Sequence, residues 1–149
     1  MKRDFIPENL YQEIISRLPI ATVDLVVKMK ESFLLVKRLE GPAKNQWWFP
    51  GGRVLFNENL EGAVKRKLKG ELNIRNYKKI KFLGVNELHF KKGIFNRPVH
   101  TITIVFLVEL NKKDCLNIRA DQTILKFNWF NNIPPNSHSH IKKFLKLVI

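Results

Sequence analysis

Apolar side chains recur at every second residue in several stretches of this chain, which is the period of a β-strand. Over residues 20–29, one face of the predicted strand carries Ala21, Val23, Leu25 and Val27, and the other carries Thr22, Asp24 and Val26. Shorter or longer stretches of the same kind predict further strands over 32–38, 47–49, 79–90, 99–110 and 127–130. Turn residues, such as Lys30-Glu31 and Gly41-Pro42, separate these stretches.

Two other stretches repeat their apolar residues every three or four positions, as an amphipathic helix does. A helix over 59–72 would bury a stripe of Leu60, Val64, Leu68 and Leu72. An opening helix over 7–17 places Leu10, Ile14 and Leu18 on one face, with Tyr11 and Ile15 beside them, and Pro7 suits its first position. A last helix is expected over 137–147. Helices between and after a mixed set of strands indicate an α/β sandwich.

The length and composition fit one folded domain over residues 1–149. The chain has 149 residues, 44% of them hydrophobic, and it contains no repeat or low-complexity linker. Its single cysteine, Cys115, excludes an internal disulfide. The opening residues lack the apolar core of a secretory signal, and no uncharged apolar run approaches the roughly 20 residues of a membrane span. We therefore expect a soluble, cytoplasmic protein that does not bind membranes.

The chain is strongly basic. Lys and Arg total 27 against 13 Asp and Glu, which gives a formal net charge of +14. Such a charge favours anionic partners, namely nucleotides, nucleic acid or acidic surfaces, although a generally basic surface explains it equally well. The basic residues are spread along the chain, and there is no arginine-rich arm, RNA-recognition motif or zinc-finger spacing. The charge by itself does not indicate a nucleic-acid partner.

The segment 51–74 carries the pattern with the most chemical content, a Gly-Gly loop followed by a helix. Such a loop lets backbone carbonyls approach a ligand closely. The helix places residues 67, 70, 71 and 74 on one face, and only Glu71 among them is acidic. A carboxylate beside a loop carbonyl is a suitable site for Mg²⁺, but Lys67 one turn earlier limits it to one ion. The alternative interpretation is a solvated ion pair between Lys67 and Glu71.

This segment resembles the Nudix box. Six residues stand at the spacing of that box: Gly52, Glu58, Arg66, Leu68, Glu71 and Ile74. Three residues depart from it: Lys67, Gly70 and Asn73. Together with the segments SRLP, TVDLVV, FLLVKR and WWFPGGRV, the chain is similar to the GDP-mannose mannosyl hydrolase branch of the Nudix family. That branch departs from the full box in a comparable way.

The resemblance implies a fold and an activity. The fold is the Nudix α/β/α sandwich with a mixed sheet, usually as a homodimer with one Mg²⁺ or Mn²⁺ per subunit. The activity is hydrolysis of a nucleotide sugar, with GDP-mannose or GDP-glucose as the leading substrate. In this branch water attacks C1 of the sugar and releases GDP, whereas most Nudix enzymes attack phosphorus.

Several site residues follow from the resemblance. Gly51, through its carbonyl oxygen, and Glu71 match metal ligands, and Gln122 fills a third ligand position if its loop is shifted by one residue. Arg38 and Arg53 match arginines that contact the diphosphate, where a guanidinium binds two phosphate oxygens at once. For both arginines the competing interpretation is an exposed charge at a strand end.

Two further residues are assigned with their expected partners. Asp24 matches an acid of the sugar region, and because it lies among apolar neighbours it needs a partner, either Arg53 or substrate hydroxyls. A purely structural ion pair is the alternative for Asp24. Arg66 matches the box arginine and is expected to support the site through Glu58 or to contact the leaving group.

The general base of the branch has no counterpart here. In the family a histidine follows the ligand glutamine, but Thr123 and Ile124 stand at that place. A general base contributes about 10²–10⁴ in rate, so either activity is low or another group serves. Asp121 in the same loop is the first substitute, and His89 is the second.

Two other functions stay open beside this one. The chain is a pyrophosphohydrolase that attacks phosphorus of another nucleoside diphosphate derivative, or it is a non-catalytic Nudix domain that binds nucleotide or RNA. Four aromatic residues are candidates to stack on a purine, with core packing as the competing interpretation: Trp47, Trp48, Phe49 and Phe90.

Overall fold

The fold is built on a mixed β-sheet. A computed structural model describes residues 6–149 and contains seven strands in that range. The strands are β1 (Ile20–Met29), β2 (Ser32–Arg38), β3 (Trp47–Trp48), β4 (Gly51–Arg53), β5 (Lys79–Phe90), β6 (Val99–Glu109) and β7 (Ile124–Phe130). Three α-helices accompany them: α1 (Glu8–Arg17), α2 (Leu60–Leu72) and α3 (Ser139–Leu145).

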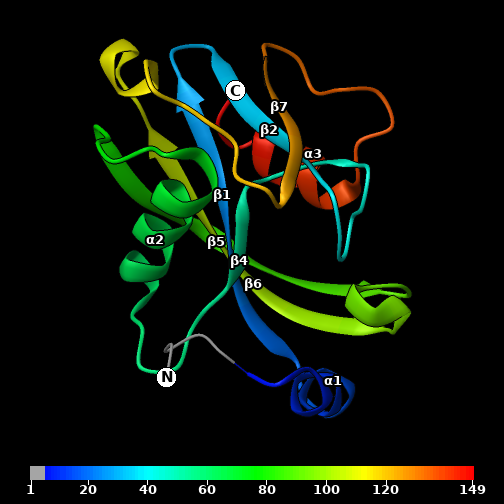
Figure 1. Ribbon diagram of the computed structural model, residues 1–149. Coiled ribbons are helices and arrows are strands. Elements are labelled where there is room, and N and C mark those ends of the chain that lie inside the picture. The colour runs from blue at the N-terminus through cyan, green and yellow to red at the C-terminus, as the bar shows by residue number, and fades with distance from the viewer. Residues whose placement is uncertain (1–5) are drawn as a thin grey trace.

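Strand β1 lies at the centre of this sheet, whose main order is β3-β2-β1-β6-β5. It runs parallel to β6 along one edge and antiparallel to two different strands along the other. On that second edge, residues 27–29 pair with β2, whereas residues 22–24 pair with β4. Strands β2 and β4 therefore pair with different parts of the same edge of β1 (Figure 1).

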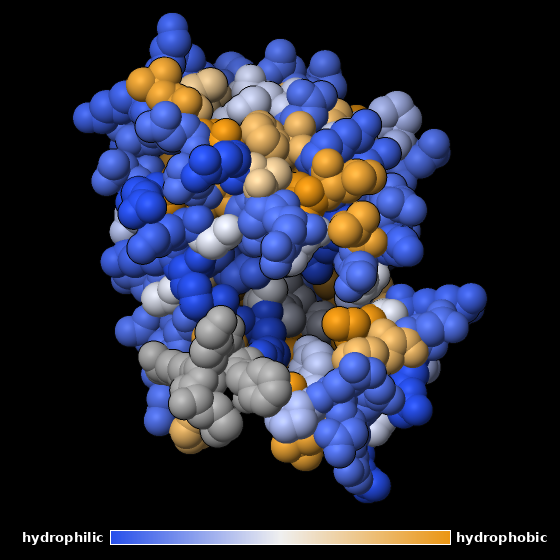
Figure 2. All heavy atoms as spheres, viewed as in Figure 1, coloured by the Kyte–Doolittle hydropathy of each residue, from blue (hydrophilic) through white to orange (hydrophobic). Residues whose placement is uncertain are grey.

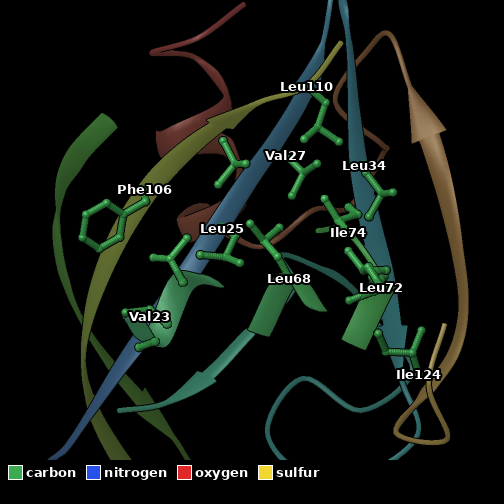
Figure 3. Packing of buried hydrophobic residues seen from close by; sticks show 14 residues of the cluster. Val23, Leu25, Val27, Leu34, Leu68, Leu72, Ile74, Phe106, Leu110 and Ile124 are labelled. Carbon is green, nitrogen blue, oxygen red and sulfur yellow. The ribbon is translucent and has the colours of Figure 1, made fainter. Parts of the chain in front are cut away.

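Helices α2 and α3 cover opposite faces of the sheet (Figure 1). The alternation of β1 explains this, because Val23, Leu25 and Val27 pack with α2 and Val26 packs with α3. Figure 3 shows the first of these clusters, in which Leu68 of α2 lies beside Leu25 of β1 and Leu72 belongs to the same cluster. The structure confirms the expected α/β/α sandwich with a mixed sheet.

Most predicted element boundaries agree with the structure, and the differences have local reasons. Helix α1 begins at Glu8, after Pro7, and buries Ile15 while Leu10 and Leu18 are 49% and 59% exposed. The prediction that the face of α1 carrying Leu10 and Leu18 packs on the fold is wrong. Helix α1 lies at the end of the sheet, and it packs along the side that carries Tyr11 and Ile15.

Three other elements differ from the sequence prediction. Strand β7 begins at Ile124, three residues before the expected start, because it pairs with β2 from Arg38 onward. Helix α3 is shorter than predicted, covering Ser139–Leu145. In α2, Asn59 accepts a hydrogen bond from Gly62 N at 2.7 Å as the N-cap, and Leu60 is 39% exposed, unlike the rest of the predicted stripe.

Strands β5 and β6 form a long antiparallel ribbon that projects beyond the body of the sheet (Figure 1). A 3₁₀ turn, η1 (Ile94–Asn96), lies at its end. Polar residues cover most of the face seen in Figure 2, with smaller hydrophobic patches between them. Across residues 6–149, no helix has the length and apolar character needed to traverse a bilayer.

Candidate functional site

A cleft with two compartments is lined by residues of β2 and β4. The smaller compartment, of about 130 Å³, is lined by residues of β1, β5 and β6 together with Trp48 and Arg53. The larger, of about 510 Å³, is lined by the loop after β2, by α2 and by residues 122–124. Tyr11, Arg38, Pro42 and Ile94 line both compartments, so the two are connected.

The larger compartment gathers the residues expected to hold a metal ion. Gly51, Glu71 and Gln122 all line it. The backbone N–H of Gly51 donates to Glu71 Oε2 at 3.2 Å, and Glu71 is only 8% exposed. A side chain at Gly51 would place its Cβ 2.1 Å from the Val23 carbonyl oxygen, so only glycine allows this strand to lie so close to β1.

Lys67 is in direct contact with the same carboxylate. Its Nζ lies 2.7 Å from Glu71 Oε1, and the two side chains are 19% and 11% exposed. The predicted ion pair is thus present, but it is shielded, unlike the neighbouring Lys65–Glu61 pair of the same helix, whose side chains are 51% and 63% exposed. Removing either partner of a shielded ion pair lowers the stability of the fold more than removing a partner of an exposed pair.

The oxygen donors of this compartment fit one hard cation. A carboxylate, a backbone carbonyl and an amide oxygen are ligands that Mg²⁺ accepts, with water or substrate oxygens completing the set. Because the Lys67 ammonium already contacts Glu71, a metal ion must displace or share this contact. We therefore expect Gly51, Glu71 and Gln122 to hold a single ion in competition with Lys67.

Arg38 connects the two compartments. The pairing of β2 with β7 shifts register between Lys37 and Arg38, and such a bulge turns the side chain that follows it. Arg53 lines the smaller compartment, with its guanidinium carbon 5.1 Å from the centre of the Tyr11 ring. Both predicted diphosphate contacts therefore face the cleft, and Tyr11, which the sequence did not single out, lies beside them.

Arg66 holds the loop after β4 against α2. Its Nε donates to Glu58 Oε1 at 2.6 Å, and its Nη2 donates to Glu58 Oε2 at 3.0 Å and to the Arg53 carbonyl oxygen at 2.8 Å. Glu58 Oε2 also accepts from Leu55 N at 2.9 Å. This geometry matches the expected supporting role through Glu58.

Asp24 is buried at 4% exposure between the cleft and the core. Its Oδ2 accepts from Trp48 Nε1 at 3.2 Å and from His140 Nε2 at 2.8 Å. The structure thus supplies Trp48 and His140 as partners of Asp24, neither of which was among the two expected ones, Arg53 and substrate hydroxyls. Sequence reasoning missed His140 because its partner lies 116 residues away in a segment with no local motif.

Both ring nitrogens of His140 have polar partners. Lys143 Nζ donates to Asn86 Oδ1 at 3.4 Å, which leaves the Asn86 amide nitrogen to donate to His140 Nδ1 at 3.0 Å. The Nε2 proton of His140 then points at Asp24. The ring also stacks on Trp48, with centroids 5.3 Å apart.

The two substitute bases lie outside the cleft. Asp121 Oδ1 accepts from Thr123 N and Thr123 Oγ1 at 2.8 and 2.6 Å, and its own N–H donates to the Glu71 carbonyl at 2.9 Å. Asp121 therefore shapes the loop that presents Gln122. His89 lies on the outer face of β5, where its Nε2 is 3.1 Å from Glu87 Oε1.

The aromatic candidates divide between core and cleft. Trp48 and Phe49 are 2% and 0% exposed and belong to the core, although Trp48 also lines the smaller compartment. Trp47 packs edge-on against Phe130, with centroids 4.9 Å apart. Phe90 lines the smaller compartment and remains a candidate to contact a ligand.

A protein-family model described as the NUDIX domain matches residues 18–140. The chain belongs to the Nudix family. One of the three departures from the Nudix box is Asn73. This residue ends α2 with a φ of 56°. Asparagine tolerates this left-handed conformation better than other residues with a side chain, so it replaces the box glycine without loss of the helix end.

The chain is also similar to individual known proteins. The chain is 30% identical over 146 residues to an ADP-ribose pyrophosphatase from Methanocaldococcus jannaschii. The match covers 95% of this chain and 77% of that protein. It is 36% identical over 69 residues to the low-salt glycan biosynthesis protein Agl8 from Haloferax volcanii. This match spans 46% of this chain and 44% of that relative, which is less than half of either protein. A MutT Nudix hydrolase structure from Burkholderia pseudomallei superposes with a TM-score of 0.73 at 22% identity. The superposition covers 89% of this chain and 100% of the Burkholderia chain.

Proposed function

We propose that this Nudix domain hydrolyses a nucleotide sugar, with GDP-mannose or GDP-glucose as the leading substrate, to GDP and free hexose. The observation that carries the proposal is the division of the cleft. The larger compartment holds the metal donors Glu71 and Gly51, the smaller holds the carboxylate of Asp24, and Arg38 lines both. Such an arrangement suits a substrate whose diphosphate and sugar require different surroundings.

The sizes of the compartments support a substrate that spans both. The smaller, of about 130 Å³, is well below the roughly 300–1,000 Å³ of a complete small-molecule site, whereas the larger falls within that range. We assign the sugar to the smaller compartment, which is lined by Thr22, Thr101 and Thr103, whose hydroxyls are hydrogen-bonded to one another. We assign the nucleoside diphosphate to the larger compartment and its mouth.

The diphosphate would lie among basic side chains. Arg38 and Arg53 offer planar guanidinium groups that bind two phosphate oxygens at once. Lys67 contributes an ammonium that is already inside the larger compartment. When a divalent ion is held by Gly51, Glu71 and Gln122, it supplies further neutralisation of the charge on the leaving diphosphate.

In the proposed reaction, the bond between sugar C1 and the diphosphate oxygen breaks. The oxygen of water forms the new bond to C1, the electron pair of the broken bond stays on GDP, and the water loses a proton. Among the described residues that line the smaller compartment, Asp24 is the only carboxylate. Because His140 and Trp48 occupy its Oδ2, we assign Oδ1, beside the side-chain-free Gly51, to orient the water and accept its proton.

Product analysis in ¹⁸O-labelled water tests this proposal. The purified protein is incubated with Mg²⁺ and each of a set of nucleotide sugars, and all products are identified by mass spectrometry. We expect GDP without label and hexose with one ¹⁸O atom. Label found in a phosphate product, with no free hexose formed, would contradict attack at C1.

A second candidate function is pyrophosphate hydrolysis, which the ADP-ribose pyrophosphatase relative favours. ADP-ribose is also a nucleoside diphosphate joined to a sugar, so the same cleft would accept it. Attack at phosphorus breaks the bridge of the diphosphate and gives AMP and ribose 5-phosphate, one of which carries the label. The same labelled-water experiment therefore separates the two reactions.

The third candidate is nucleotide or RNA binding without turnover. The shielded Lys67–Glu71 pair favours it, because a carboxylate already neutralised by an ammonium holds a metal ion less tightly. This function predicts saturable binding of the ligand, no product with any substrate, and binding that is unchanged in Glu71→Gln.

A further inference from the structure

Three potential metal ligands meet on the outer face of the β5–β6 ribbon. His89 of β5 lies directly opposite His100 of β6 in the strand register. Glu87 lies two residues before His89, so its side chain projects from the same face of β5. One ligand atom from each residue lies within 4.8 Å of the other two.

The two imidazoles are held in one orientation. The rings of His89 and His100 stack with centroids 4.2 Å apart and planes 19° apart. Their Nε2 atoms lie 3.1 and 2.8 Å from the same atom, Glu87 Oε1. Both ring nitrogens therefore lie close to the same carboxylate oxygen.

His100 Nε2 adds an independent observation. It is shielded from solvent and makes no hydrogen bond to any described group, although Glu87 Oε1 is only 2.8 Å away. The close contact with a carboxylate oxygen shows that this shielded nitrogen already faces a negatively charged ligand atom. A cation between His100 Nε2 and Glu87 would satisfy this nitrogen.

We propose that Glu87, His89 and His100 form a second cation site, specific for Zn²⁺ or a similar late transition metal and separate from the cleft. Two imidazole nitrogens and one carboxylate oxygen are a ligand set that zinc accepts, with water in the fourth position. Mg²⁺ prefers oxygen ligands only, so it belongs with the donors around Glu71. The site needs no nucleotide and does not depend on the proposed hydrolase reaction.

The site lies behind the wall of the cleft. Leu88 and Phe90, which alternate with the ligands along β5, line the smaller compartment. Val99 and Thr101 of β6, on either side of His100, line it as well. An ion that joins the two strands would therefore stiffen the ribbon on which one side of the smaller compartment is built.

Zinc binding to protein that carries no histidine tag tests the proposal. The protein is titrated with Zn²⁺ by calorimetry in the presence of excess Mg²⁺, and Co²⁺ is used as a spectroscopic probe. We expect one tightly bound Zn²⁺ per chain and strong visible d–d bands with Co²⁺, as a tetrahedral site gives. His89→Gln and Glu87→Gln, at residues whose side chains are 70% and 58% exposed, should each weaken Zn²⁺ binding at least about tenfold.

Two controls make the result decisive. His138→Gln removes a histidine outside the cluster and should leave Zn²⁺ binding unchanged. Cys115→Ser removes the single thiol of the chain, the strongest competing zinc ligand, and should also have no effect. The proposal is overturned if no Zn²⁺ binds in excess Mg²⁺, if binding survives His89→Gln with unchanged affinity, or if Cys115→Ser abolishes it.

Discussion

His140 Nε2 lies 2.8 Å from Asp24 Oδ2, and this contact joins the last helix to the central strand of the sheet. Asp24 pairs with Gly51 across β1 and β4, so the contact also links α3 to the strand that carries Gly51, one of the proposed metal ligands. A buried carboxylate needs such partners because burial without them is costly. The pair therefore serves stability and keeps one carboxylate at the wall of the cleft.

Asp24→Asn is expected to lower both stability and turnover. The amide keeps the shape but loses the charge that strengthens the hydrogen bonds from Trp48 and His140, which costs about 1–3 kcal/mol. Urea unfolding measures the change. Glu31→Gln, at an exposed turn carboxylate, should stay within about 0.5 kcal/mol of wild type. Equal stability of Asp24→Asn and wild type would show that the buried charge contributes nothing.

Glu71→Gln is expected to remove most metal-dependent turnover. The variant loses the only carboxylate among the three proposed metal ligands, and loss of one such electrostatic group costs about 10²–10³ in rate. Initial rates over a range of Mg²⁺ concentrations measure it. Glu61→Gln, in the exposed ion pair with Lys65 on the same helix, is the matched control and should keep the wild-type rate. Near-normal turnover by Glu71→Gln would exclude Glu71 as a metal ligand.

Lys67→Gln is expected to change the metal requirement in the opposite direction. Because the Lys67 ammonium lies 2.7 Å from Glu71, its removal frees the carboxylate for the ion. The Mg²⁺ concentration that gives half-maximal binding should fall several-fold. Each tenfold fall corresponds to about 1.4 kcal/mol of binding free energy. Lys65→Gln, with the same helical spacing but an exposed partner, should leave it unchanged. A higher Mg²⁺ requirement in Lys67→Gln would mean that Lys67 supports the ion rather than competing with it.

The sequence predicted the parts of this molecule that depend on local patterns. The alternation in residues 20–29 predicted both the bounds of β1 and the two faces that α2 and α3 cover. The resemblance to the Nudix box implied that Gly51 and Glu71 lie together, and they are joined by a hydrogen bond. In such motifs the geometry of one loop and one helix decides the outcome.

What the sequence did not reveal depends on distant pairing. Asp24 and His140 are brought together only by the packing of α3 on the sheet, and no spacing rule connects them. Tyr11 reaches the cleft because α1 lies against the end of the sheet, which its periodicity does not specify. Asp121 satisfied the chemical requirement for a base, but its carboxylate is engaged by Thr123 in the loop.

Arg38→Lys is expected to weaken substrate binding although the charge is kept. A lysine ammonium is a point charge and lacks the planar pair of donors that binds two phosphate oxygens. The loss of one charge-assisted hydrogen bond corresponds to an increase in KM of about tenfold to a hundredfold. Arg75→Lys, at an exposed position after α2, is the control and should leave KM unchanged. An unaltered KM in Arg38→Lys would place the diphosphate elsewhere.

The stability of the α3 end of the molecule should depend on pH through His138. Its Nδ1 accepts a hydrogen bond from His140 N at 3.1 Å as the cap of α3, and this contact requires an unprotonated nitrogen. Although the side chain is on the surface, its ring packs 5.1 Å from the Trp48 ring. This burial, together with the nearby His140, holds the pKa of His138 below its ordinary value of 6.5.

The direction of the effect follows from this lowered pKa. Well above pH 6.5 His138 is neutral in both the folded and the unfolded chain, so its contribution to stability is complete. As pH falls from there through the pKa of the folded state, the unfolded chain takes up the proton first and this contribution is lost. His138→Asn keeps a side-chain acceptor for the cap but cannot titrate. Urea unfolding at pH 7.5 and 5.0 should therefore show a larger loss of stability for wild type than for His138→Asn, and an equal loss in both proteins would mean that the cap does not sense pH.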